Sequence, residues 1–498
     1  MVNRIKCRFV IVLLLFSVVA QSQNAFNGTR QSVGSKKGTA FNKNRVNDFN
    51  AHRQSLNAEY VKKTREKWNT FNSLRGIISP DKDSKPVFPV VMSEEDAVRD
   101  KRDKEVVVEG IIKPLHDRGV PKPFAPIQEN IREHTDDFKF SYLGTSLSVR
   151  VPIKQSLHLS STLEDAVADA WEYLCGDYYN NMIVDCLKLR SGLNLCDWAY
   201  LMMLKTLGET LYPNRSNEAV LLTAYIFSQS GYKIRLGERN GRLEMLYASK
   251  HKVYEKPYFE FGDDRFYSMS DEIGEMRINA AQYPQERSLS LWVEKEPQIT
   301  YSATQDRTLV SKRYPSMSVI VSANKNILPF YNSYPSSEVG GNFMTRWAMY
   351  ANMPISKELR ENLYPQLKQG IAGCTQLQSV ERLLNWVQTA FVYEYDDTVW
   401  GTDRSFFPEE TLYYPYCDCE DRSILFTRLV RDLLGLKCLL IYYPGHLATA
   451  VCFEESVNGD YLNVNGNRYV VCDPTYIGAS VGHTMPDMDN ETAKVIVL

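Results

Sequence analysis

The sequence lacks a strong charge of either sign. Its 498 residues include 58 Lys and Arg against 60 Asp and Glu, which gives a formal net charge of −2. A protein that mainly binds nucleic acid carries a basic surface, so this balance argues against that class of partner. With 44% hydrophobic and 12% aromatic residues, the chain is expected to be globular, and its length predicts about two to four domains.

Metal-ligand spacings and long apolar runs are also missing. No paired Cys-x-x-Cys motifs and no His-Glu-x-x-His motif occur, so no dedicated metal site and no cofactor are predicted. After residue 20 no apolar run is long enough to span a membrane, so the mature chain is expected to have no transmembrane segment.

The first twenty residues have the pattern of a secretory signal peptide. Basic residues at 4, 6 and 8 precede an apolar core from Phe9 to Val19, and Val18-Val19-Ala20 suits cleavage after residue 20. A membrane anchor is the alternative, but the run is short for a span. The protein is therefore expected to be exported, to the periplasm or to the cell surface and beyond. Of ten cysteines, Cys7 lies in the signal, and the remaining nine leave one unpaired thiol if the others form disulfides.

Residues 21–126 are predicted to form a long segment between the signal peptide and the folded domains. Gln21–Asn44 is polar and predicted to be disordered, a basic helix is predicted over Val46–Leu74, and Ser79–Pro126 reads as a Pro- and charge-rich linker crossed by one short strand, Glu105–Ile112. The helix is interpreted either as a basic stalk that meets an envelope surface or a partner, or as a solvated spacer, which is favoured.

The rest of the chain divides into three predicted parts. Residues 127–275 form a mixed α/β domain, with two strands about Gly144 and helices from Leu163 to Leu211. Short strands separated by polar turns predict a small β module over 276–335. Helical patterns then open a last domain, 336–498.

Three residues with reactive side chains lie in the stretch 417–476: Cys419, His446 and Asp473. A thiol, an imidazole and a carboxylate are the parts of a cysteine-nucleophile triad. Apolar spacing predicts a helix over Arg422–Leu434, which places Cys419 at or just before its first turn. The positive end of the helix dipole favours a thiolate there, and the free N–H groups could hold an oxyanion.

The other two residues are predicted to lie at strand ends. Lys437–Tyr443 reads as a buried strand, a second strand begins at His446, and Arg468–Cys472 leads directly to Asp473. On the second strand the His446 face carries the small side chains of Ala448 and Ala450, so a helix end is expected to pack against that face. Base and orienting acid would thus lie on neighbouring strands beneath the nucleophile.

This arrangement resembles the transglutaminase-like superfamily, and specifically its exported bacterial members. The resemblance is carried by Asp418-Cys419-Glu420-Asp421, Gly445-His446 and Asp473-Pro474-Thr475, and upstream by Trp386-Val387-Gln388 and residues 393–396 and 408–412. It covers the last third of the chain. It implies an α+β, papain-like core in which the nucleophile helix packs on an antiparallel sheet.

The resemblance also implies a chemistry. Cys419 would be the nucleophile, His446 the base and Asp473 the orienting acid of an enzyme that acts on protein or peptide amides through a thioester. Hydrolysis is favoured over amine transfer, and a cell-envelope component is a candidate substrate. Gln388 is a candidate oxyanion donor. Relatives usually carry Gly where this chain has Cys417, which leaves open a Cys417–Cys419 redox pair. A non-catalytic binding or scaffold protein with the same fold is the alternative.

A second stretch looks like a degenerate copy of the same core. Asn217–Leu236 repeats the helix-Gly-apolar-Lys step into a strand, with Gly231 in the place of Gly435 and Arg215 in the place of Cys419. Residues 160–275 are therefore interpreted either as a transglutaminase-like domain without a nucleophile or as an ordinary helix–strand unit.

Overall fold

The computed structural model describes residues 36–76, 87–98, 105–107, 111–113, 119–130, 135–153, 156–338 and 342–498. The chain forms two compact units, one ending at His52 and one running from Arg53 to Leu498. The predicted signal peptide, 1–20, and residues 21–35 of the predicted disordered stretch lie outside the described residues.

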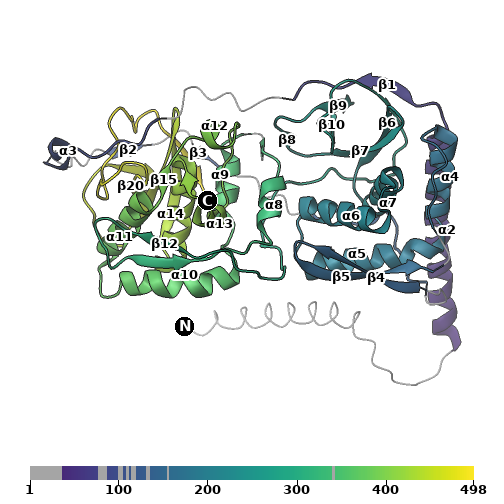
Figure 1. Ribbon diagram of the computed structural model, residues 1–498, viewed down its shortest axis with the longest axis horizontal. Helices are drawn as coiled ribbons and strands as arrows, with labels where there is room; N and C mark the ends of the chain where they lie inside the picture. The colour runs from purple at the N-terminus through teal and green to yellow at the C-terminus, as the bar shows by residue number, and fades with distance from the viewer. Residues whose placement is uncertain are drawn as a thin grey trace, which may run out of the picture. The chain divides into compact units, whose positions relative to one another are not determined.

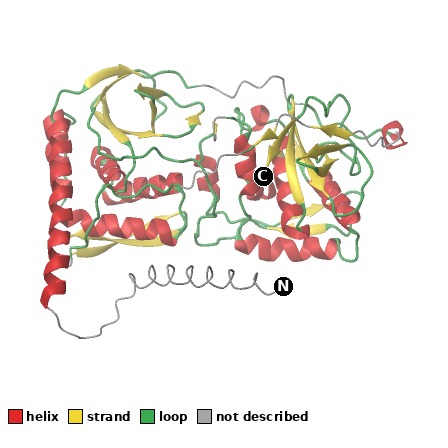
Figure 2. Ribbon diagram, turned by 180° about the vertical axis from the view of Figure 1, so that it is seen from behind, coloured by secondary structure: helices red, strands yellow, loops and turns green. Residues whose placement is uncertain are grey.

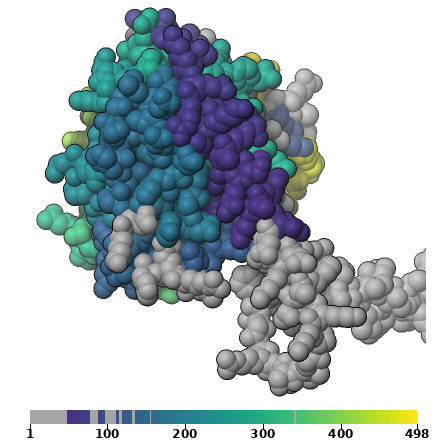
Figure 3. Space-filling model, turned by 90° about the vertical axis from the view of Figure 1, so that its right-hand side faces the viewer, coloured from purple at the N-terminus to yellow at the C-terminus, as the bar shows by residue number. Residues whose placement is uncertain are grey.

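The described residues between 36 and 76 are more ordered than the sequence predicted. Helix α2 (Lys36–Thr64) begins inside the stretch expected to be disordered and ends ten residues before Leu74. The chain then forms β1 (Asn69–Asn72), which pairs with a strand of the first sheet. Arg53 on α2 is buried and donates to Asn180 Oδ1 at 2.6 Å. From Arg53 onward, α2 is therefore a packed helix and not a solvated spacer, as the purple residues of Figure 3 illustrate.

The amino-terminal elements agree with the predicted mixed α/β domain. A hairpin pairs β4 (Thr135–Tyr142) with β5 (Thr145–Pro152) about the turn at Gly144, as expected. Helices and antiparallel strands follow, and the sheet order is β1-β11-β6-β7-β10-β9. Figure 2 shows this sheet curled in yellow. The elements are α4 (Glu164–Leu174), α5 (Asn180–Gly192), α6 (Asp197–Leu211), α7 (Ser216–Gln229), β6 (Ile234–Arg239), β7 (Arg242–Ala248), β9 (Tyr258–Phe261), β10 (Asp264–Ser268) and β11 (Glu275–Ile278).

The stretch 276–335 does not form a module of its own. Strand β11 belongs to the first sheet, where it pairs with β6. The hairpin of β12 (Arg307–Val310) and β13 (Ser318–Val321) packs against α10 (Lys357–Gly370) and α11 (Gln376–Ala390). Its apolar side chains enter the core of the carboxy-terminal domain because α10 and α11 offer an apolar face to them. The spacer predicted from turn-rich sequence is thus divided between its two neighbours.

A seven-stranded sheet organises the carboxy-terminal domain, in the order β2-β19-β20-β18-β17-β21-β3 (Figure 1). Its five central strands are antiparallel to one another, and helices pack against it, so the fold belongs to the α+β class. The central strands are β17 (Lys437–Tyr443), β18 (His446–Cys452), β19 (Tyr461–Val464), β20 (Asn467–Cys472) and β21 (Lys494–Val497).

Both edges of this sheet come from the predicted linker. Strand β2 (Glu105–Val107) pairs in parallel with β19, and β3 (Ile111–Ile112) pairs in parallel with β21. One short strand was predicted here, and the structure forms two, at opposite edges. Among the described residues, no helix is long and apolar enough to cross a membrane.

Candidate active site

Helix α14 (Cys419–Leu434) begins with a reciprocal cap. The Asp418 side chain accepts a hydrogen bond from the Asp421 backbone N–H at 3.4 Å, and Asp421 Oδ2 accepts one from the Asp418 N–H at 3.2 Å. Such a capping box fixes where a helix starts. Cys419 is therefore the first residue of the helix, as predicted, and Asp421 stabilises the helix start.

The imidazole is held by the carboxylate. His446 opens β18 directly after the turn at Gly445, whose φ of 78° suits glycine. Its Nε2 lies 2.8 Å from Asp473 Oδ2, and both side chains are buried. Asp473 itself follows β20 and accepts from the backbone N–H groups of Thr475 and Tyr476 at 2.8 and 3.2 Å. The acid is thus fixed by the chain that follows it.

The second ring nitrogen of His446, Nδ1, is buried and has no hydrogen-bond partner within the described part of the chain. Cys419 and His446 line one small cavity of about 20 Å³, together with Trp347, Glu420, Tyr442, Gly445 and Leu447. A space of this size holds about one water molecule. Since Nε2 is bound to Asp473, Nδ1 is the nitrogen available to a group in this cavity.

The helix packs on the face of β18 opposite to the one predicted. Ser423 Oγ donates to the Leu447 carbonyl at 2.8 Å, and the hydroxyls of Thr427 and Thr449 lie 3.1 Å apart. Ala448 and Ala450 lie on the other face and pack in a separate apolar cluster. The small size of Ala448 and Ala450 does not decide which face of β18 contacts the helix. Ser423 and Thr427, one turn apart on α14, form hydrogen bonds with polar groups of β18. The spacing of these two hydroxyl residues is the sequence feature that could have predicted the correct face.

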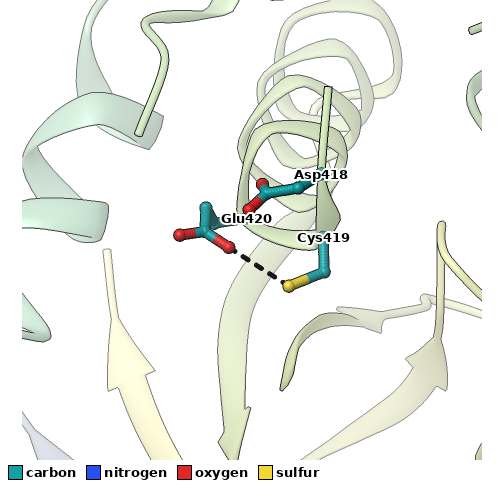
Figure 4. A group of neighbouring side chains, drawn as sticks. All are labelled: Asp418, Cys419 and Glu420. Atoms are coloured by element: carbon teal, nitrogen blue, oxygen red, sulfur yellow. Dashed lines mark hydrogen bonds between the residues drawn. The ribbon is translucent and has the colours of Figure 1, made fainter. Parts of the chain in front are cut away.

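The Cys419 thiol is neutral and bonded to its neighbour. Figure 4 shows Cys419 Sγ donating to Glu420 Oε2 at 3.1 Å. Burial raises the pKa of this thiol well above its usual value, and the neighbouring acidic side chains of Glu420 and Asp418 raise it further. The Leu447 backbone acts in the opposite direction with a smaller effect. The thiolate expected from the helix dipole is therefore not favoured here, since burial and the acidic neighbours outweigh the dipole.

Acidic groups gather around Glu420, which lines the cavity. Oxygens of Asp396, Asp403 and Glu420 lie within 4.8 Å of one another, a spacing that a cation could bridge, as do ligand atoms of Asp418, Cys419 and Glu420. A resident positive charge already faces them, because the buried Arg346 pairs with Asp403 at 2.9 Å. Sequence reasoning missed this pair. Its only signal was an arginine in the otherwise apolar helix α9 (Thr345–Asn352).

Gln388 does not fit the predicted role of oxyanion donor. Its Nε2 donates to the carbonyls of Asp473, Tyr476 and Ala479 at 3.0, 2.8 and 3.1 Å, and it does not line the cavity with Cys419. Both amide hydrogens are thus committed to the loop after β20. Gln388 is a buried support that holds the segment carrying Asp473, which corrects the prediction.

Cys417 lies on β16 (Tyr416–Cys417), beside β15 (Val392–Tyr393), and its sulfur contacts the Val392 carbonyl at 3.8 Å. Burial raises the pKa of its thiol to about 11. Cys417 and Cys419 are both free thiols, and all nine cysteines in the described residues are free. The predicted redox pair is not oxidised in this structure.

Comparisons of the chain with known protein families, with curated proteins and with solved structures find no match. The chemistry of the site itself is therefore what indicates a function.

Proposed function

We propose that this chain is an exported cysteine enzyme of the transglutaminase-like, papain-like type, which acts on peptide-like amides through Cys419, His446 and Asp473. Hydrolysis is the favoured outcome, with a protein or peptide of the cell envelope as substrate and no cofactor required. One observation carries the proposal: Cys419 and His446 line the same cavity, and His446 is tied to Asp473 through Nε2 while Nδ1 has no partner in the described residues.

The neutral thiol favours one order of proton transfer. Because the Cys419 proton is held by Glu420, attack requires the S–H bond to turn from Oε2 toward His446 Nδ1. The imidazole then accepts the proton as sulfur bonds to the amide carbon. Asp473 supports the imidazolium, which returns the proton to the departing amine or ammonia when the C–N bond breaks. A thioester remains, with Asp473 unchanged.

Water completes the cycle. It gives a proton to His446 and attacks the thioester, and the C–S bond breaks as the imidazolium returns the proton to sulfur. A primary amine in place of water would give transfer instead of hydrolysis. The two outcomes differ only in the acceptor, so they need separate readouts.

The test is turnover of a broad peptide mixture by the full mature chain. New amino termini report peptidase action, free ammonia reports side-chain amidase action, and uptake of a fluorescent primary amine reports transfer. We expect Cys419→Ala and His446→Ala each to lower turnover by about 10³-fold or more. Cys374→Ser, a half-buried cysteine outside the cavity, is the matched control and should keep full activity.

A non-catalytic scaffold is the second candidate, favoured by the raised pKa of Cys419 and by the one-water cavity. It predicts no product in any of the three assays from the wild-type chain. Loss of product in Cys374→Ser but not in Cys419→Ala would contradict the enzyme proposal directly.

A further inference from the structure

The helix and hairpin of the candidate site recur in the amino-terminal domain at a constant spacing. Strand β7 begins at Arg242 and ends at Ala248, and β18 begins at His446 and ends at Cys452, so 204 residues separate both pairs of ends. The ends of β6 and β17 are separated by the same 204 residues, from Arg239 to Tyr443. Helices α7 and α14 precede these hairpins at the same distance to within a residue or so.

The two sheets also share one strand order. The first runs β9-β10-β7-β6-β11 and the second β19-β20-β18-β17-β21, with antiparallel pairing throughout both series. Upstream, the β4–β5 hairpin packs on α5 and α6, as the β12–β13 hairpin packs on α10 and α11. Five strands in each sheet, ten in all, follow the same order, and in each domain one helix packs on the equivalent strand, α7 on β7 and α14 on β18. This agreement favours a duplicated domain over an ordinary helix–strand unit.

The copy lacks all three reactive groups. The spacing of 204 residues places Arg215 at the position of Cys419 and Arg242 at the position of His446. Met269 follows β10 directly, as Asp473 follows β20. Two guanidinium groups and a thioether cannot act as nucleophile, base and orienting acid at neutral pH, since arginine stays protonated.

A larger cavity lies next to the positions equivalent to the candidate active site, although Arg215 and Arg242 do not line it. It measures about 250 Å³, against about 20 Å³ beside Cys419. Ser216, Leu243 and Met269 line it, at the positions of Glu420, Leu447 and Asp473. Its other apolar walls are Leu201, Ala219, Val220 and Met245.

The charged side chains that line this cavity, Lys205, Glu209 and Glu244, all have partners. Lys205 bonds to Glu209 at 2.6 Å, and Glu244 accepts from Ser268 Oγ at 2.6 Å. The volume falls below the roughly 300–1,000 Å³ of sites that enclose a whole drug-sized molecule. The cavity therefore suits one apolar group and not a charged cofactor.

We infer that the amino-terminal domain is a copy that binds without catalysis, and that its cavity holds an apolar side chain of a polypeptide, such as Phe, Leu or Met. The polypeptide class rests on the proposed function, in which the carboxy-terminal domain acts on a peptide amide. The cavity and the duplication do not rest on it.

Binding is tested by saturation-transfer NMR on the full mature chain carrying Cys419→Ala, with three probes. These are the blocked tripeptides acetyl-Gly-Phe-Gly-amide and acetyl-Gly-Ser-Gly-amide, and n-hexanol as a free apolar group. We expect the Phe peptide to bind and the Ser peptide not to bind. Val220→Trp fills the half-buried wall of the cavity and should lower affinity by about tenfold or more.

Two further variants make the result decisive. Met269→Trp fills the cavity from the end of β10, whereas Val220 lies on α7, so it replaces Val220→Trp if that variant does not fold. Leu163→Trp, at an exposed position outside the cavity, is the matched control and should bind as the parent does. Equal binding of both peptides, or Phe binding that survives both cavity variants, overturns the inference. Hexanol binding without peptide binding overturns the polypeptide class.

The outcome is separable from that of the proposed function. Binding of the Phe peptide is measured in a chain that lacks the Cys419 thiol, so it does not depend on turnover, and the two cavities share no lining residue. Peptide binding without turnover by the wild-type chain would remove the enzyme and keep the binding copy.

Discussion

We expect the side chain of Glu420 to control the reactivity of the Cys419 thiol, and Glu420→Gln tests this directly. In the folded chain the Cys419 proton points to Glu420 Oε2, 3.1 Å from sulfur, so a thiolate would face a carboxylate at that distance. Two unit charges so placed repel by roughly 5 kcal/mol at an effective dielectric of about 20, an upper limit for a site that also contains a buried arginine. Glutamine keeps the shape of the side chain and removes the charge.

The expected result is a more reactive thiol. Each 1.36 kcal/mol of relief raises the thiolate fraction about tenfold, so even a quarter of that repulsion gives about a tenfold gain at neutral pH. The sign is fixed, because removing a neighbouring negative charge lowers the pKa of the Cys419 thiol. The measurement is the rate of iodoacetamide alkylation at neutral pH, followed by mass spectrometry of the peptide that contains Cys419.

Two further variants show what causes a change in the alkylation rate of Cys419. Glu361→Gln removes an exposed charge on α10 and should leave the rate as in the wild type. Introducing His446→Ala into the Glu420→Gln chain should remove much of the gain if the imidazole shares the thiol proton. An unchanged or slower rate in Glu420→Gln would show that burial alone holds the thiol neutral and would refute the role given to Glu420.

Three further outcomes follow from the fold. Gln388→Ala removes the donor shared by three buried carbonyls, so we expect about 2–4 kcal/mol of lost stability in urea unfolding and lower turnover as Asp473 shifts. At the end of α14, Gly435→Ala meets no atom within 4 Å and should cost about 1 kcal/mol for its φ of +71°. At the equivalent Gly231 the new Cβ would lie 1.9 Å from the Lys122 carbonyl oxygen, so Gly231→Ala should cost roughly 3 kcal/mol or more in the same assay, and similar losses would contradict the close contact. Burial raises the pKa of Asp418, so the folded chain keeps a proton that the unfolded chain releases, and stability falls as pH rises; Asp418→Asn keeps the cap and should flatten this fall between about pH 5 and pH 8, which denaturation at both values measures.

Local patterns predicted the elements of the candidate site well. Alternation and the turn at Gly445 predicted β17 and the start of β18 to the residue, because hairpin geometry is set by neighbours in the chain. The helix after Cys419 followed from apolar spacing and from the left-handed Gly435 that ends it. The pairing of His446 with Asp473 was expected from their places at strand ends.

Features that depend on distant residues were not predictable. Strands β2 and β3 are too short to read as sheet edges, and their partners lie more than three hundred residues away. The end of α2 at Thr64 depends on a distant element, because the chain that follows forms β1, which pairs with β11 of the first sheet. The neutral state of Cys419 required burial, which no local pattern reports.

The edge strands β2 and β3 make the carboxy-terminal sheet depend on a segment that lies far earlier in the chain. Both come from a segment that is synthesised before the amino-terminal copy, yet they complete a sheet whose last strand ends at Val497. A fragment that begins after the amino-terminal copy would lack β2 and β3. The outer edges of β19 and β21 would then expose unpaired backbone N–H and C=O groups, and such edges template aggregation. The carboxy-terminal domain is thus not expected to fold as a separate fragment, and in a nascent chain β2 and β3 can pair only after almost the whole protein has been made.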